Sequence, residues 1–195
     1  MTDRSTSNGQ KSPTCPPMNT PASRQPIVPT ISPDMHLNIL IPSMSLGGAE
    51  RIVHDILTAL SRRKPTAKLF VLHEVDRSYP LDESGWFQVF RLSGLKDAQR
   101  LRTIAMEVLA SPSPVLFTHL IRETHLRPLW DFGVQTVPVI HNSQPSWQDP
   151  PSVYDHPNVP YVVAVSDAVA DQLRAAGCGN APRRARASAW CRADR

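Results

Sequence analysis

LNILIPSMSLGGAERIVHDIL, residues Leu37–Leu57, joins a short apolar run, two glycines and an amphipathic pattern in that order. The run Leu37–Ile41 is almost entirely apolar, as is typical of a parallel strand buried on both faces. After the glycines, apolar residues recur with helical spacing at Ile52, Val53, Ile56, Leu57 and Leu60. The segment therefore predicts a buried strand, a tight turn and the first turns of a helix.

The same alternation continues through residues 36–178. Further strands are expected at Lys68–Leu72, Phe87–Leu92, Val115–Thr118, Val137–Ile140 and Tyr161–Val165. Helices are expected at Asp97–Leu109, with Leu101, Ile104, Ala105 and Val108 inward, around Leu126–Phe132, and at Asp167–Ala176. Ser166 is the expected N-cap of the last helix, and Gly177 its left-handed terminal residue. This alternation predicts an α/β fold, a Rossmann-like, doubly wound domain with a mostly parallel sheet.

Residues 1–35 have a different composition. They contain seven prolines together with many Ser, Thr and Asn residues, which cannot build a core, so we expect a flexible leader. The chain has no apolar run near the ~20 residues that span a bilayer, and no signal-peptide h-region follows Arg4. These observations predict a cytoplasmic protein. The odd number and spacing of the cysteines, Cys15, Cys178 and Cys191, favour neither a disulfide framework nor a zinc site.

Residues 179–195, GNAPRRARASAWCRADR, break the alternation where another strand is due. Five arginines against one aspartate give this tail a charge of +4, which equals the net charge of the whole chain. The basic character thus belongs to the tail alone, and its arginines form no amphipathic repeat, so we do not expect nucleic-acid binding. The tail is either disordered or the product of a shifted reading frame, since GC-rich codons read out of frame yield Arg, Ala, Pro and Gly. We favour the shifted frame or a truncation.

Gly47 and Gly48 lie where open α/β sheets bind ligands, beyond the carboxyl end of the first strand. Glycines there let a ligand approach the backbone and permit positive φ. The unpaired N–H groups and dipole of the following helix suit a phosphate. Neither the G-x-G-x-x-G fingerprint nor the P-loop motif is present, however. The alternative is a tight strand-to-helix turn that binds nothing.

Three motifs occur in order along the chain: GGAER at 47–51, VIHNS at 139–143 and VVAVSDAVADQLRAAGC at 162–178. Together they resemble the N-terminal domain of the family 4 glycosyltransferases, retaining enzymes built from two Rossmann-like domains. The resemblance covers about residues 37–178. It implies transfer of a sugar from a nucleotide-sugar donor to a hydroxyl acceptor, with no cofactor and no required metal.

The resemblance also implies roles for individual residues. Gly47 and Gly48 would face the donor diphosphate, and His141 would lie near the transferred sugar, where an imidazole can donate or accept a hydrogen bond. For His141 the alternative is a polar loop residue. For Glu50, in the same motif as the glycines, it is a first-turn charge that suits the helix. The acceptor-side candidates are Asn142, Ser143 and Arg122.

The second domain of such enzymes supplies an Arg, a Lys and an E-x(7)-E motif, none of which is recognisable here. Because catalysis needs charge stabilisation in a closed cleft, we expect the chain to be the acceptor-side half and inactive alone. Its expected partners are a nucleotide sugar, a sugar, glycolipid or small hydroxyl acceptor, and the missing C-terminal domain. A lipid-linked acceptor would bring it to the inner face of a membrane.

Two other classes of function stay open. One is a binding module that holds a nucleotide or phosphorylated sugar without turnover. The other is a Rossmann interaction protein, in which Gly47 and Gly48 only make the turn.

Overall fold

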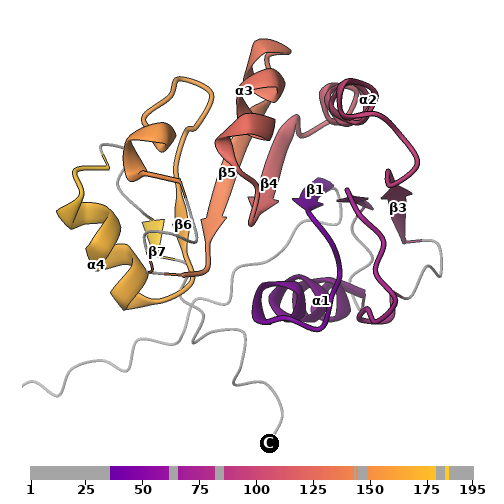
Figure 1. The fold of residues 1–195 in the computed structure, drawn as a ribbon, viewed down its shortest axis with the longest axis horizontal. Helices are drawn as coiled ribbons and strands as arrows, with labels where there is room; N and C mark the ends of the chain where they lie inside the picture. The colour runs from indigo at the N-terminus through magenta and orange to yellow at the C-terminus, as the bar shows by residue number, and fades with distance from the viewer. Residues whose placement is uncertain are drawn as a thin grey trace, which may run out of the picture. The chain divides into compact units, whose positions relative to one another are not determined.

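The computed structural model describes residues 36–61, 66–81, 86–142, 144, 149–178 and 183–184. The expected leader, most of the tail and Ser143 lie outside these residues. In the described part, each expected strand and helix is present, and the fold is the expected α/β, Rossmann-like arrangement (Figure 1).

A single sheet carries the strands of the described part in the spatial order β3-β2-β1-β4-β5-β6-β7, and every neighbouring pair is parallel. The strands are β1 His36–Ile41, β2 Thr66–Val71, β3 Phe87–Arg91, β4 Val115–His119, β5 Gln135–Ile140, β6 Val163–Ala164 and β7 Arg183–Arg184. From β1 the chain first extends the sheet through β2 and β3, and then returns to build it outward from β4. The order therefore reverses between β1 and β4, which is where sheets of this kind bind ligands.

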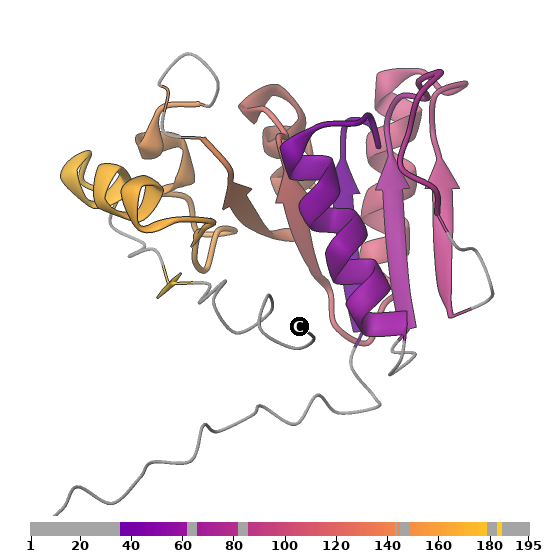
Figure 2. The same ribbon diagram turned by 90° about the horizontal axis from the view of Figure 1, so that it is seen from below.

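Helices cover both faces of the sheet. They are α1 Gly48–Ser61, α2 Asp97–Leu109, α3 Glu123–Asp131 and α4 Asp167–Ala175, with a 3-10 helix, η2, at Pro151–Tyr154. Helix α1 packs on β1 and β2 (Figure 2), where Val53 and Leu57 join Ile39 and Leu69 in one apolar cluster. Helices α2, α3 and α4 contribute to a second cluster, and Figure 1 shows α2 and α3 on the opposite side of the sheet from α1.

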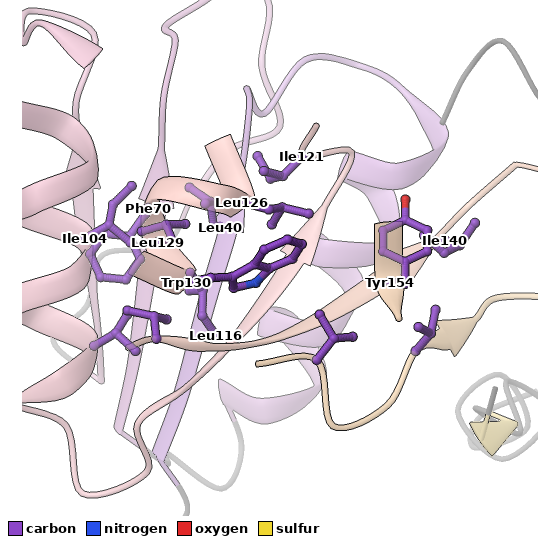
Figure 3. Packing of buried hydrophobic residues seen from close by; sticks show 14 of the residues in the cluster. Leu40, Phe70, Ile104, Leu116, Ile121, Leu126, Leu129, Trp130, Ile140 and Tyr154 are labelled. Atoms are coloured by element: carbon purple, nitrogen blue, oxygen red, sulfur yellow. The ribbon is translucent and has the colours of Figure 1, made fainter. Parts of the chain in front are cut away.

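Trp130 lies in the second cluster, where Figure 3 shows it among Leu126, Leu129 and their neighbours. Its indole is 6% exposed, and Nε1 donates to Oγ1 of Thr136 at 2.8 Å. A buried N–H without a partner would cost about 1–3 kcal/mol. This hydrogen bond therefore lets a large aromatic side chain fill the space between α3 and β5.

A buried amide joins the two central strands. Asn38 of β1 is 1% exposed, and its Nδ2 donates to the carbonyl oxygens of Ser113 and Val115 at 2.9 and 3.1 Å. The bonds fasten β1 to the entry of β4, so they help to fix the relative register of the strands on either side of the reversal point.

Several local predictions are confirmed. Helix α2 has the predicted bounds, and Leu101, Ile104, Ala105 and Val108 are its buried residues. The Ser166 side chain accepts a hydrogen bond from the Val169 N–H, and Gly177 has φ 72°. Ser166 therefore caps the N-terminal end of α4, and Gly177 follows its C-terminal end in the left-handed conformation that glycine favours.

Other predictions are wrong in detail. Strand β4 continues to His119, one residue beyond the predicted end, and β6 has two residues instead of the five of Tyr161–Val165. The tail was expected to contain no strand, yet Arg183–Arg184 pairs in parallel with β6. A two-residue ladder rests on backbone hydrogen bonds, so it carries no side-chain period that a sequence pattern could reveal.

The inward face of α1 also differs from the expected one. Val53, Leu57 and Leu60 are buried as predicted, but Ile52 and Ile56 are only half-buried, and Glu50 is buried in the first turn. The helix is thus rotated so that a carboxylate, and not an isoleucine, points inward at its N-terminal end.

Candidate functional site

The candidate site lies at the carboxyl edge of the sheet, beside the point where strand order reverses. Three connections meet the edge there: the loop from β1 into α1, the turn from β4 into α3, and the segment that follows β5. Each carries one of the polar groups described below. The fold thereby brings together residues that are far apart in the sequence.

The glycine pair forms the entry to α1. The Gly47 N–H donates to the Ser45 carbonyl at 2.8 Å, and the Gly47 carbonyl accepts from the Arg51 N–H at 3.1 Å. Neither Gly47 nor Gly48 has positive φ. The turn therefore does not use the positive φ that glycine permits, because ordinary backbone geometry suffices to start the helix here.

The two glycines face different surroundings. A Cβ atom on Gly47 would lie 2.4 Å from Oε2 of Glu50, whereas around Gly48 no described heavy atom lies within 4 Å of such a position. The missing Cβ of Gly47 therefore makes room for the carboxylate of Glu50, while Gly48 faces open space.

Glu50, for which the sequence analysis gave a first-turn charge as the alternative to donor contact, does lie in the first turn of α1. It is 8% exposed, and its Oε1 accepts a hydrogen bond from Oγ of Ser45 at 2.8 Å. Its carboxylate is therefore buried within the protein. The next residue, Arg51, has a side chain that is 72% exposed and 3.7 Å from Asp55.

A pair of histidines forms the centre of the site. His119, the last residue of β4, is 2% exposed, and its Nδ1 lies 2.9 Å from Nε2 of His141 at the end of β5. The other ring nitrogen of His141, Nδ1, is buried and has no hydrogen-bond partner among the described residues. His141 follows directly after β5 and is half-buried, with one ring nitrogen held near His119 and the other buried inside the protein.

Both imidazoles are neutral at pH 7. Burial, and to a lesser extent the neighbouring His141, lowers the pKa of His119 from 6.5 to about 3. Burial also lowers the pKa of His141 to about 4, although the negative charge of Glu50 opposes this shift. Glu50, His141 and His119 therefore form one electrostatic group that draws on α1, β5 and β4.

His119 was missed as a site residue. The sequence analysis ended the fourth strand at Thr118 and assigned no role to His119. One signal was present, since a polar histidine ends an apolar strand at the edge where ligands bind. Its partner, 22 residues away, could be found only from the pairing of β4 with β5.

Arg122 is the N-cap residue of α3. Its Nη1 lies 3.6 Å from Oδ1 of Asp149, and Oδ2 of Asp149 accepts the Glu123 N–H at 2.6 Å. A carboxylate at this place satisfies a helix N–H that has no partner within the helix. Tyr154 lies nearby at 2% exposure, and burial raises the pKa of its hydroxyl well above the usual range.

Arg122 and Asn142 line one small cavity with His141, Leu120 and Tyr154. Its volume of about 30 Å³ has room for about one water molecule. The side-chain oxygen of Asn142 accepts the Gln144 N–H at 2.8 Å, which is a local turn. The structure thus brings the acceptor-side candidates Arg122 and Asn142 together, but the cavity between them is small.

A larger cavity lies on the other side of the β1–α1 loop. It has a volume of about 560 Å³ and is lined by Met44 of that loop and by residues that follow β2, among them His73, Glu74, Asp76 and Tyr79. Arg91 at the end of β3 also lines it. Charged and polar side chains thus make up much of the lining of this cavity.

Two further searches concern the described part of the chain. No group of three or more His, Cys, Asp or Glu side chains there could hold a metal ion. No helix there has both the length and the apolar character needed to cross a membrane.

Comparison with known proteins gave no match: no family model, no curated protein and no solved structure is significantly similar to this chain.

Proposed function

We propose that the chain is the acceptor-side half of a retaining glycosyltransferase of the family 4 type, and that the Glu50–His141 region contacts a sugar hydroxyl of the nucleotide-sugar donor. The observation that carries this proposal is the buried Nδ1 of His141, which has no hydrogen-bond partner among the described residues, on a ring that the charge of Glu50 also reaches. A hydroxyl group both donates and accepts hydrogen bonds. A ring nitrogen and a carboxylate facing one small region can satisfy both demands.

The geometry changes the role expected of the glycines. The Gly47 N–H is already bonded to Ser45, and the nearby carboxylate of Glu50 disfavours an anion in contact with Gly47. A diphosphate is better served by the open side of Gly48 and the N-terminal N–H groups of α1. In this proposal Gly48 faces the diphosphate, and Gly47 accommodates Glu50.

The acceptor is assigned to the larger cavity in the same proposal. The cavity near Arg122 and Asn142 is too small for a sugar, whereas about 560 Å³ beside Met44 and Tyr79 accommodates one. Because Met44 belongs to the β1–α1 loop, this cavity adjoins the loop that would hold the donor. The class of acceptor is then a sugar or a sugar-like hydroxyl compound.

Binding of nucleotide sugars to the whole chain tests the proposal. Isothermal titration with UDP-glucose, GDP-mannose and ADP-glucose is expected to show binding of at least one, weakened about tenfold or more by His141→Ala, which removes one hydrogen bond to the ligand. His36→Ala is the matched control, because His36 begins β1 at the opposite edge of the sheet. Binding of none, or equal binding by both variants, would overturn the proposal.

Activity is expected to need the second domain. The chain incubated with a binding nucleotide sugar and simple glycosides should release no more nucleotide than the His141→Ala variant does. Sustained sugar transfer by the chain alone would contradict this expectation.

One observation favours a second candidate, the Rossmann interaction protein. The packing of Glu50 by itself explains why residue 47 lacks a side chain, so that glycine needs no ligand to account for it. If no nucleotide sugar binds, this second candidate takes precedence.

A further inference from the structure

The glycine turn, residues 45–48, is shaped by hydrogen bonds that run within the loop and the first turn of α1. Ser45 accepts the Gly47 N–H on its carbonyl and donates from Oγ to Glu50, both at 2.8 Å. The Gly47 carbonyl accepts the Arg51 N–H at 3.1 Å. These bonds join residues close in sequence, so they fix the shape of the turn and not its place against the rest of the fold.

A segment farther along the chain contacts the turn from outside. The Tyr79 N–H donates to the Met44 carbonyl at 2.9 Å, and Ser78 forms an antiparallel bridge with Ser45. The distance is that of an ordinary backbone hydrogen bond. This pairing fastens the residues that precede the glycines to residues that follow β2.

The side chain of Tyr79 contacts the other flank of the turn. The centroid of its ring lies 5.3 Å from that of His54, with the ring planes at 31°, within the range of favourable aromatic pairs. His54 belongs to the second turn of α1, after the glycines. Tyr79 is half-buried and packs against the apolar cluster that contains Met44 and Val53. One residue thus contacts the chain on both sides of the glycine turn.

Tyr79 is also part of the larger cavity. Together with Met44 and Ser78 it lines this space of about 560 Å³. A molecule in the cavity would therefore lie against the residues that fasten the glycine turn, and the open side of Gly48 belongs to the same turn. The cavity and the start of α1 are thus joined through Tyr79.

We propose that Tyr79 is a positioning residue, which braces the glycine turn from both flanks and thereby holds the N–H groups at the start of α1 in a fixed direction. Hydrogen-bond donors that are already held in place lose less freedom when a ligand binds. The use of these N–H groups for a donor diphosphate rests on the proposed function, but the brace itself does not.

Amide hydrogen exchange of the ligand-free, whole chain tests the brace. Exchange rates of the Gly47 and Arg51 N–H groups are measured by ¹H–¹⁵N NMR, with Ile104 of α2 as the reference for unfolding of the whole domain. In Tyr79→Leu the rates at Gly47 and Arg51 should rise about two- to tenfold more than the rate at Ile104, as expected for loss of one aromatic pair. Tyr79→Phe keeps the ring and should keep the wild-type rates.

Tyr161→Leu is the matched control, because Tyr161 is a half-buried tyrosine that precedes β6. It should leave the rates at Gly47 and Arg51 unchanged relative to Ile104. The same result in Tyr79→Leu would overturn the proposal, because Tyr79 would then contribute to general stability alone.

A second variant decides if Tyr79→Leu does not fold. His54→Asn removes the other ring of the pair, and asparagine has a helix propensity similar to that of histidine. The His54 side chain is 28% exposed, so little buried packing is lost. Faster exchange at Gly47 and Arg51 relative to Ile104 is again the expected result, and unchanged relative rates would overturn the proposal.

Titration with UDP-glucose is a separate measurement. Tyr79→Leu should bind this nucleotide sugar more weakly than the wild type does, and equal binding would overturn the positioning role. Failure of the wild type to bind any nucleotide sugar counts against the proposed function and leaves the exchange result standing.

Discussion

A Cβ atom on Gly47 would stand 2.4 Å from the Glu50 carboxylate, while the same atom on Gly48 would meet no described atom within 4 Å. Two adjacent glycines of one motif are thus constrained in different ways. The first is required by packing within the protein, and the second is left accessible at the helix N-terminus.

Alanine at each glycine distinguishes these constraints. Gly47→Ala should lower the free energy of unfolding by about 1 kcal/mol, because Glu50 must move and give up its hydrogen bond from Ser45. Gly48→Ala should leave it unchanged or slightly raised, since alanine is the better helix former. Urea denaturation of the two variants measures both effects. Equal losses in the two variants would contradict the packing role of Gly47.

The histidine pair predicts a loss of stability in mild acid. Burial holds the pKa values of His119 and His141 at about 3 and about 4, against about 6.5 in the unfolded chain. As the pH falls below about 6.5, the unfolded chain binds protons that the folded chain excludes, so the free energy of unfolding decreases. Each histidine contributes a slope of about 1.4 kcal/mol per pH unit until its folded pKa is reached.

Urea denaturation between pH 7.5 and pH 4.5 measures this slope. His119→Asn removes one of the two titrating groups and should make the slope shallower, which separates the histidines from the carboxylates that titrate at lower pH. A wild-type profile that is flat down to pH 5 would refute buried neutral histidines.

Asp149 is predicted to stabilise α3 from outside the helix. Asp149→Ala removes the acceptor for the Glu123 N–H and should cost about 1 kcal/mol, as the loss of an N-cap does. Asp149→Asn keeps an acceptor oxygen and should recover most of that loss. Thermal unfolding followed by circular dichroism compares the two, and equal midpoints would show that the hydrogen bond contributes nothing.

Leu120, which has φ 57°, is predicted to be the wrong residue type for its backbone. Asparagine tolerates positive φ, so Leu120→Asn should be as stable as the wild type or more so. Leu120→Val should be less stable by about 1–2 kcal/mol, because a β-branched side chain resists this conformation. Both side chains would be partly exposed, so burial changes little. Thermal midpoints of the pair decide, and the opposite order would remove the argument from strain.

The elements were predictable where their signals are local. The bounds and buried face of α2 follow from one periodic pattern, and the left-handed conformation of Gly177 follows from C-cap chemistry. The spatial order of the strands could not be predicted from the sequence pattern, because pairing partners such as β1 and β4 lie far apart along the chain.

The site was predictable only in part for the same reason. His141 and the glycine pair stand in motifs that can be read in sequence, whereas the role of His119 depends on contact with a residue on the neighbouring strand. Whether Glu50 is buried depends on the rotation of α1 about its own axis. A small rotation would turn Glu50 outward and bury a different residue of the helix in its place. Arg122 and Asn142 lie together as expected, but only the three-dimensional packing shows how little room they enclose.

The β4–α3 connection holds two residues that follow β5. His141 is bonded to His119 at the start of this connection, and Asp149 is bonded to Glu123 at its end. An inserted residue between His119 and Glu123 would therefore disturb both bonds at once. Natural variation in this connection is expected to change its composition far more freely than its length.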